Sequence, residues 1–431
     1  MDGRAHAEAV EALQREGGMD GRAALERLTD PFGWMAAARR QQFADSYRWF
    51  QRGLALLGTP AFDIRQVVIG GQATPVQMRV AAQSPFCRLT EFRLATESTH
   101  ASASRQRILL CAPLAGHRAV QLSEAIRSLL PDADVYVTDW IDARDIPLDA
   151  GAFSLESYVR HIEGYLRLLE PAGLHVVAVC QATVPVLAAL VRVAEQGGGE
   201  PSTLTLIGGP VDAREGQTPL GRTAATLPPA WFEANAMVEV PAGFVGEGRR
   251  VYPGFLQFQA LVMAQPQRHW SLLSAWSCRW LGDKARLRAL ETEFASHAAV
   301  LDIDARFFLD TVDVVYRQAL LPRGQWRIDA EPVRLDRIQR TRLLTVEAAR
   351  DDISGPGQTH AAHRLCSGLA ADARERITVA DADHYGLFGG QTWREQVHPR
   401  LRQWMAAADA ADLTATARAR PRPATRRTPE S

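Results

Sequence analysis

The sequence predicts an α/β fold: a mostly parallel sheet, helices on both faces and a large helical cap insertion. Three observations lead to this prediction. Short apolar runs alternate with segments of helical spacing, one apolar run stops at a cysteine where a helix begins, and the alternation is interrupted between residues 212 and 335. Strands that alternate with amphipathic helices are typical of βαβ units with right-handed crossovers.

The predicted strands are short apolar runs bounded by turn residues. They lie at residues 67–69, 76–80, 87–89, 107–112, 135–140, 174–179, 204–207, 341–346 and 376–380. Helices are expected between the later strands. One of them is predicted to begin at Ser154, a favourable N-cap residue, with Glu156 in its first turn.

These elements predict five regions along the chain. They are a helical N-terminal extension (1–60), the first part of the α/β core (61–211), the cap insertion (212–335), the second part of the core (336–406) and a tail (407–431). The insertion is rich in aromatic residues and is predicted to be helical, without further strand signals. The tail is rich in Ala, Arg, Pro and Thr, which predicts disorder.

Composition excludes several classes of protein. The chain has 431 residues, of which 46% are hydrophobic and 23% charged, and its net charge is +0. This balance is typical of a globular protein with a sizeable core and argues against duplex nucleic acid as a partner. No apolar run approaches the ~20 residues of a membrane span, and the first residues lack a signal-peptide pattern. We therefore expect a soluble, intracellular protein.

A nucleophile is predicted where the strand at 174–179 ends. The pattern changes there to helical spacing, and the sequence of strand, one reactive side chain and helix is that of a nucleophile elbow. The Gly-x-Ser-x-Gly box of α/β-hydrolases appears as Ala178-Val179-Cys180-Gln181-Ala182. Alanine is the next smallest residue, so the turn is expected to form with more strain. Cys180 is the candidate nucleophile; the alternative is a small buried side chain without a catalytic role.

A thiol nucleophile needs a base and a carboxylate that orients it. In an α/β-hydrolase they follow in the order nucleophile, acid, histidine, each just after a strand. Asp351 and Asp352 follow the eighth predicted strand, and His384 follows the ninth. The acid is thus Asp351 or Asp352, and Asp351 fits better because Ile353 can anchor its loop.

Other residues have predicted supporting roles. The backbone N–H groups of Gln181 and, more weakly, Leu114 are expected to form the oxyanion hole. His117 is expected to line the site rather than act as the base. His360 and His363 follow the acid and could form a metal pair, but we expect no metal. The five cysteines are scattered without a C-x-x-C pair, so neither a disulfide framework nor a zinc site is indicated.

Long strings of residues carry a resemblance to a known family. They are residues 60–64, 135–144, 179–181, 183–189, 208–214, 248–257, 351–355, 357–359 and 384–386. Between about Pro60 and Trp404 the sequence resembles the intracellular poly(3-hydroxybutyrate) depolymerases, also called polyhydroxyalkanoate depolymerases. Ala182 departs from the family pattern, which has proline there.

The resemblance implies an α/β-hydrolase that degrades stored polyester on cytoplasmic granules and releases 3-hydroxybutyrate monomers or oligomers. The triad of the family falls on Cys180, Asp351 and His384. Attack by Cys180 on an ester would form a thioester, which water, a hydroxyl or a thiol such as coenzyme A could resolve. No other cofactor is expected. The partners implied are the granule surface and polyester chains, with no nucleic acid and no membrane span, and the oligomeric state stays open.

Two alternatives accompany this interpretation. A polyhydroxyalkanoate synthase-like acyltransferase also uses a cysteine at an elbow, and a granule-associated protein without catalysis could keep the same fold. Nucleic-acid binding by the arginine-rich tail is less favoured, because no folded basic module accompanies the tail.

Overall fold

The computed structural model describes residues 45–48, 61–95, 105–114, 116–264 and 299–419. The chain divides into two compact units, Met1–Leu56 and Leu57–Ser431. In the first unit only a helical turn at residues 45–48 is described, so most of the predicted 1–60 extension lies outside the described residues. The sheet and the helices that cover it belong to the second unit.

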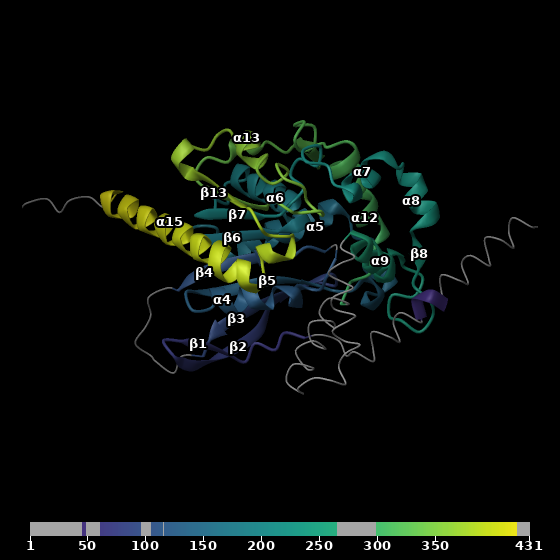
Figure 1. Ribbon diagram of the computed structural model, residues 1–431, viewed down its shortest axis with the longest axis horizontal. Coiled ribbons are helices and arrows are strands. Elements are labelled where there is room, and N and C mark those ends of the chain that lie inside the picture. Colours follow the sequence, from purple (N-terminus) through teal and green to yellow (C-terminus); the bar gives the residue numbers. More distant parts are fainter. Residues whose placement is uncertain (1–44, 49–60, 96–104, 115, 265–298, 420–431) are drawn as a thin grey trace, which may run out of the picture. The chain divides into compact units, whose positions relative to one another are not determined.

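The described part of the second unit contains a nine-stranded sheet (Figure 1). Its strands are β1 (Gln66–Ile69), β2 (Gln72–Gln83), β3 (Cys87–Leu94), β4 (Gln106–Cys111), β5 (Ala133–Trp140), β6 (Leu174–Val179), β7 (Thr203–Ile207), β13 (Arg342–Ala348) and β14 (Arg374–Val379). All nine predicted strands are present, several extended by a few residues. Their order in the sheet is β1-β2-β3-β5-β4-β6-β7-β13-β14.

The pairing of these strands confirms the predicted fold class. β1, β2, β3 and β5 pair antiparallel in succession, whereas β5, β4, β6, β7, β13 and β14 pair in parallel. β4 lies between β5 and β6, so the chain reverses direction across the sheet at this point. This is the topology of the α/β-hydrolase fold. The carboxyl ends of β6, β13 and β14 therefore meet at one edge of the sheet.

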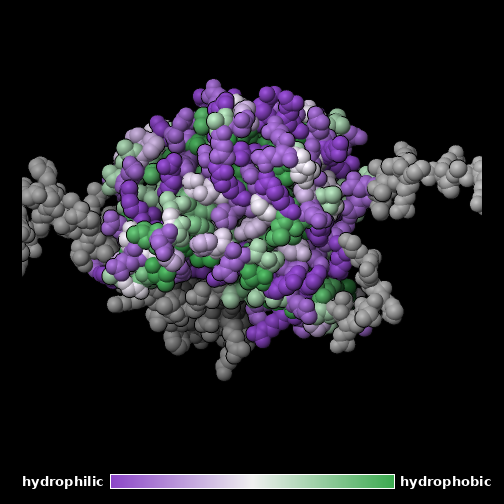
Figure 2. Space-filling model, turned by 180° about the vertical axis from the view of Figure 1, so that it is seen from behind, coloured by the Kyte–Doolittle hydropathy of each residue, from purple (hydrophilic) through white to green (hydrophobic). Residues whose placement is uncertain are grey.

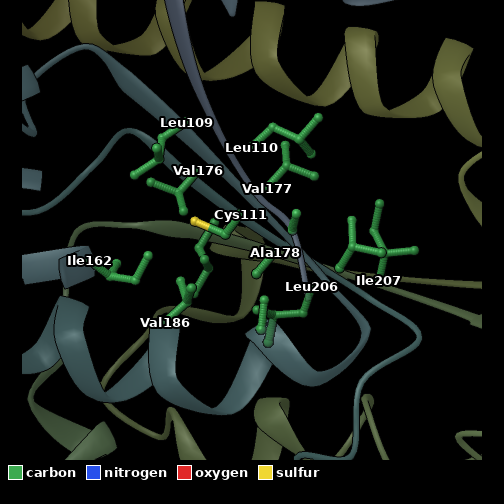
Figure 3. Packing of buried hydrophobic residues seen from close by; sticks show 14 of the residues in the cluster. Leu109, Leu110, Cys111, Ile162, Val176, Val177, Ala178, Val186, Leu206 and Ile207 are labelled. Carbon is green, nitrogen blue, oxygen red and sulfur yellow. The ribbon is translucent and has the colours of Figure 1, made fainter. Parts of the chain in front are cut away.

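Helices cover both faces of the sheet. On one face lie α4 (Ser123–Leu129) and α15 (His398–Ala419), and on the other α5 (Leu155–Leu169) and α6 (Thr183–Glu195). Figure 3 shows side chains of β4, β6 and β7 packed with Ile162 of α5 and Val186 of α6. The predicted N-cap is confirmed, since Ser154 and Ser157 form a reciprocal capping box at the start of α5.

The insertion is not entirely helical, which corrects the prediction for residues 212–335. It contains α7 (Pro219–Thr226), α8 (Pro229–Asn235), α9 (Gly254–Ala264) and α12 (Ala305–Thr311), but also β8 (Val238–Glu239), β9 (Arg250–Tyr252) and β10 (Ile303–Asp304) in a three-stranded sheet and the pair β11 (Arg327–Ile328) and β12 (Glu331–Pro332). Strands of two or three residues are too short to show a two-residue period. They form because distant segments pair, as β9 does with β10.

Buried polar contacts hold the insertion against the core. The guanidinium group of Arg249 is buried and donates to the carboxylate of Asp304 (2.9 Å) and to the carbonyl oxygen of Gly151 (2.6 Å). The carboxylate of Asp142, which follows β5, accepts the N–H of Asp302 at 3.2 Å. These contacts fix the insertion above the edge of the sheet where β6 ends.

The start of the predicted tail is ordered, which corrects the expected disorder of residues 407–431. α15 continues to Ala419, and residues 420–431 lie outside the described residues. Asp409 in this helix accepts a hydrogen bond from Gln106, and its carboxylate lies 3.2 Å from Nε2 of the fully buried His175. The Arg- and Pro-rich composition of residues 418–427 concealed an alanine-rich stretch of high helix propensity that begins earlier.

Hydrophilic and hydrophobic residues are interspersed on the part of the surface that the structure describes. On the face in Figure 2, hydrophobic residues are scattered among hydrophilic ones. Within the described ranges, no helix combines the length and apolar character that crossing a membrane requires.

We predict that Asp409→Ala lowers the free energy of unfolding by about 1–3 kcal/mol, because the amide of Gln106 loses its acceptor and the buried His175 loses the carboxylate beside it. Urea unfolding at pH 7 measures the change. Asp381→Ala is the matched control, since the Arg350–Asp381 pair is exposed on both sides, and its expected effect is below about 0.5 kcal/mol. Equal effects of the two substitutions would contradict an ordered helix at this position.

Candidate active site

Cys180 stands at a sharp turn between β6 and α6. Its backbone φ is +55°, a left-handed conformation that residues other than glycine rarely adopt. A 3₁₀ turn over Cys180–Ala182 leads into α6, and the carbonyl oxygen of Cys180 accepts a hydrogen bond from the Thr183 hydroxyl at 2.9 Å. Ala178 and Ala182, which replace the glycines of the motif, are completely buried. The structure thus forms the strained elbow with alanine on both sides of it.

Two glycines after β7 leave the space that the elbow occupies. A Cβ atom on Gly209 would lie 1.9 Å from Oγ1 of Thr183 and 2.6 Å from the carbonyl oxygen of Cys180. A Cβ atom on Gly208, whose φ is +56°, would lie 3.2 Å from Cε1 of His384. The sequence predicted no role in the site for these two glycines. A double glycine directly after a central strand was the available signal.

Asp351 and His384 form a buried pair beside the elbow. Nδ1 of His384 lies 2.7 Å from Oδ2 of Asp351. The other carboxylate oxygen, Oδ1, accepts the N–H groups of Ile353 (2.9 Å) and Ser354 (2.8 Å). These bonds hold the Asp351 carboxylate beside His384, and the choice of Asp351 over Asp352 as the catalytic acid stays a prediction. Ile353 holds the Asp351 carboxylate through its backbone N–H, and its side chain packs against the core as the expected apolar anchor of the loop.

Opposing effects act on the pKa of His384. Burial lowers it, but the charges of Asp351 and Cys180 raise it, as do the hydrogen bonds of His384 with both residues. The net result is a pKa well above the ordinary value for histidine. Since Nδ1 is bonded to Asp351, Nε2 is the ring nitrogen left to face Cys180. The structure therefore brings the three residues predicted from the sequence together in one row, in the order Cys180, His384 and Asp351.

A cavity of about 330 Å³ opens above this row. Its lining includes Cys180, His384 and Gln181 from the core. Apolar side chains of the insertion form the opposite wall: Leu220 and Ala224 of α7, Phe232 of α8, Phe308 of α12 and Val312. The cavity thus suits an apolar substrate presented to a thiol.

The two predicted oxyanion donors, Gln181 and Leu114, lie in different surroundings. Gln181 lies in the cavity wall at the start of the elbow turn, and its side-chain amide donates to the hydroxyl of Thr311 at 3.4 Å. The side chain of Leu114 is buried in the core and does not line the cavity. In the same loop the N–H of Gly116 donates to Oε1 of Gln257 at 2.8 Å, so this amide is already occupied. The assignment of Gln181 and Leu114 as oxyanion donors stays a prediction.

The other histidines considered from the sequence have protein partners. His117 lines the cavity, and its Nε2 lies 3.0 Å from the hydroxyl of Tyr385. His360 and His363 both contact the hydroxyl of Thr345 at 2.7 Å, away from the cavity. Among the described side chains, no cluster of three or more His, Cys, Asp or Glu has the arrangement of a metal site.

Residues 208–409 match a protein-family model described as PHB de-polymerase C-terminus. The match confirms the resemblance over that part of the chain, which contains Asp351 and His384 but not Cys180. It supports a hydrolytic function. The curated proteins searched contain no match.

Solved structures with a similar fold include several hydrolases. A membrane phospholipase A described as a bacterial virulence factor is 12% identical, with a TM-score of 0.44 and coverage of 90% of this chain and 99% of that one. Fungal esterases from Rhizomucor miehei are represented by a chain with 11% identity, a TM-score of 0.43 and coverage of 86% and 90%. A monoacylglycerol lipase from Paleococcus ferrophilus has 14% identity, a TM-score of 0.41 and coverage of 71% and 96%.

We predict that Gly209→Ala lowers the free energy of unfolding by about 1–3 kcal/mol or more, because the added methyl overlaps Thr183 and the Cys180 backbone. Gly164→Ala is the control, since Gly164 lies inside α5 with no atom within 4 Å of an added Cβ. Its expected effect is a gain of about 0.5–1 kcal/mol. Thermal and urea unfolding measure both. A neutral Gly209→Ala variant would contradict the tight elbow.

We predict that His363 makes the protein less stable at mildly acidic pH. Burial, followed by the charges of Arg376, His360 and Arg374, lowers its pKa from 6.5 to about 4. A histidine with a depressed folded-state pKa contributes stability above 6.5 that is lost as the pH falls towards about 4. The free energy of unfolding should therefore fall by about 1 kcal/mol between pH 7 and pH 5, after allowance for solvent screening. In His363→Gln the free energy of unfolding should fall less between pH 7 and pH 5. An unchanged fall would mean that other titrating groups cause it.

Proposed function

We propose that this protein is a carboxylic ester hydrolase that depolymerises stored poly(3-hydroxybutyrate) or a related polyhydroxyalkanoate through an acyl-cysteine intermediate. The observation that carries the proposal is the row Cys180–His384–Asp351, with Cys180 on a strained elbow at the floor of an apolar cavity. The family match over residues 208–409 supports the polyester as substrate. Release of 3-hydroxybutyrate monomers or oligomers would follow.

The first half of the reaction forms a thioester. The proton that Cys180 and His384 share lies on Nε2 of His384 as the sulfur attacks the ester carbonyl carbon, and Asp351 stabilises this imidazolium through Nδ1. The carbonyl oxygen takes up the negative charge and accepts the N–H of Gln181, with Leu114 as the second donor. The carbon–oxygen bond then breaks, and His384 gives the proton to the departing alcohol oxygen.

The second half releases the acyl group. His384 accepts a proton from water, and the hydroxide attacks the thioester carbon. The carbon–sulfur bond then breaks, which leaves the proton shared between His384 and Cys180 as at the start. A thioester is also a good acyl donor to another thiol. Coenzyme A is therefore an alternative acyl acceptor, which would release an acyl-coenzyme A in place of the acid. No further cofactor is part of the proposal.

Features of the surface agree with an insoluble apolar substrate. Leu220 on α7 and Trp231 on α8 are large apolar side chains that are more than one-third exposed, and Leu220 also lines the cavity. Contact of this part of the cap with a polyester granule in the cytoplasm would lead a chain from the granule to Cys180. Granule association and cytoplasmic location belong to the proposal on these grounds.

The reverse reaction is the strongest alternative. A synthase-like acyltransferase would use the same row of residues to transfer a hydroxyacyl group from coenzyme A to a polymer end. The two functions differ in direction: the depolymerase releases soluble 3-hydroxybutyrate from amorphous granules, and the synthase consumes the acyl-coenzyme A.

We predict that Cys180→Ala lowers the release of soluble 3-hydroxybutyrate from amorphous granules by at least about 1,000-fold, because the nucleophile is lost. Mass spectrometry of the wild-type protein after brief exposure to granules should find Cys180 carrying a hydroxyacyl group. Cys366→Ala, at a buried cysteine that does not line the cavity, should keep most of the activity. Undiminished release by Cys180→Ala, or activity without acylation of Cys180, would refute the mechanism.

A further inference from the structure

A tyrosine of the cap lies at the candidate active site. Tyr316 lies in η6 (Val312–Arg317), a π-helical turn that continues α12 above the elbow. Its side chain lines the cavity together with Cys180 and His384. π-helical turns are found frequently at functional sites, where they shift one side chain out of the helical register. The phenol of Tyr316 is carried on such a turn and shares a cavity with the candidate nucleophile.

The hydroxyl of Tyr316 is available to a substrate. In the part of the chain that the structure describes, no hydrogen bond involves this hydroxyl. Neighbouring polar groups of the cavity wall are occupied: the Thr311 hydroxyl donates to the carbonyl oxygen of Phe307 (2.8 Å), and the Gln257 amide donates to that of Leu301 (2.5 Å). Tyr316 is only partly buried and lines the cavity, so its hydroxyl can bond an oxygen of a substrate there.

Tyr316 lies on the acid side of the nucleophile. The ring of Tyr316 borders α7, where a Cβ on Gly221 would come within 4.0 Å of it. Thr218, the N-cap of α7, donates to the carbonyl oxygen of Ile353 in the loop of Asp351 at 3.3 Å. Tyr316 also interacts with the charges of both Cys180 and Asp351. The predicted oxyanion donors belong instead to the elbow turn and to the loop after β4.

This placement decides which substrate oxygen Tyr316 meets. In an ester under attack, the carbonyl oxygen points to the oxyanion donors, and the leaving oxygen points to the histidine that protonates it. We propose that the Tyr316 hydroxyl donates a hydrogen bond to the leaving alcohol oxygen of the scissile ester. The inference rests on the ester-hydrolase function proposed above. Tyr316 keeps its proton throughout, and the proton that the alcohol gains comes from His384.

The electrostatics of the site support a donor role. Burial raises the pKa of Tyr316, and the negative charges of Cys180 and Asp351 raise it further. The phenol therefore stays protonated over the whole working range of pH and can donate to an oxygen that develops negative charge. Stabilisation of such an oxygen matters most when the alcohol is a poor leaving group, as the secondary alcohol of a polyester is.

The test compares two leaving groups on one acyl group. For full-length protein, kcat/KM is measured with ethyl butyrate and with p-nitrophenyl butyrate, because this parameter reports the steps up to departure of the alcohol. Tyr316→Phe should lower kcat/KM for the ethyl ester about 10- to 100-fold, as expected for loss of a hydrogen bond to a charged oxygen. The value for the p-nitrophenyl ester, whose leaving group needs no assistance, should change by less than about 3-fold.

Tyr252→Phe is the matched control. Tyr252 lines the same cavity but stacks on Phe308, with ring centroids 4.0 Å apart, and no charge of Cys180 or Asp351 acts on it. Loss of the Tyr252 hydroxyl should change kcat/KM for both esters by the same factor. Thermal unfolding of both variants separates an effect on folding from an effect on the reaction, since a structural role would not discriminate between leaving groups.

Each outcome decides the inference. An equal loss on both esters in Tyr316→Phe, or no loss, overturns it. If the wild-type protein cleaves both butyrate esters but not amorphous poly(3-hydroxybutyrate), the proposed polymer substrate is wrong. The kcat/KM values of Tyr316→Phe with the two esters still test the role of Tyr316. If the wild-type protein cleaves no ester, both fall together.

Discussion

The left-handed backbone of Cys180 is the constraint on which the site depends. A non-glycine residue in this conformation costs about 1–2 kcal/mol, so the surroundings must hold it. β6 enters the turn fully buried, α6 leaves it with a buried face, and the Thr183 hydroxyl ties the Cys180 carbonyl oxygen. Gly208 and Gly209 leave the necessary room. The strain exposes the sulfur above the sheet, where His384 can reach it.

The site also requires a charged pair, His384 and Asp351, next to an apolar cavity. Burial by itself would favour the neutral imidazole of His384, and the carboxylate of Asp351 reverses this preference. That carboxylate cannot turn away, because backbone N–H groups hold its second oxygen. The core thus supplies the chemistry on three loops at one edge of the sheet. The cap supplies apolar side chains to the cavity wall and, from η6, the side chain of Tyr316.

Much of this arrangement was predictable because it depends on local patterns. Buried strands of five to eight residues leave apolar runs, and the switch of period at Cys180 marks the elbow without any glycine. Asp351 and His384 were predictable because parallel strands end at one edge of the sheet, so loop residues in the right order must meet there. The choice between Asp351 and Asp352 rested on a weaker signal, the apolar Ile353. The structure adds the backbone amides that hold the Asp351 carboxylate beside His384.

The sequence by itself determined the sheet, the position of the turn at Cys180 and the types of residue that surround it, because these depend on short-range hydrophobic period and chain order. Only the tertiary structure decided the rest. The short strands of the cap, the ordered helix through Asp409, the space at Gly209 and the placement of Tyr316 all arise where segments distant in the chain pack together. Such contacts leave no period in the sequence, because each depends on the shape of a partner that the chain reaches only after folding.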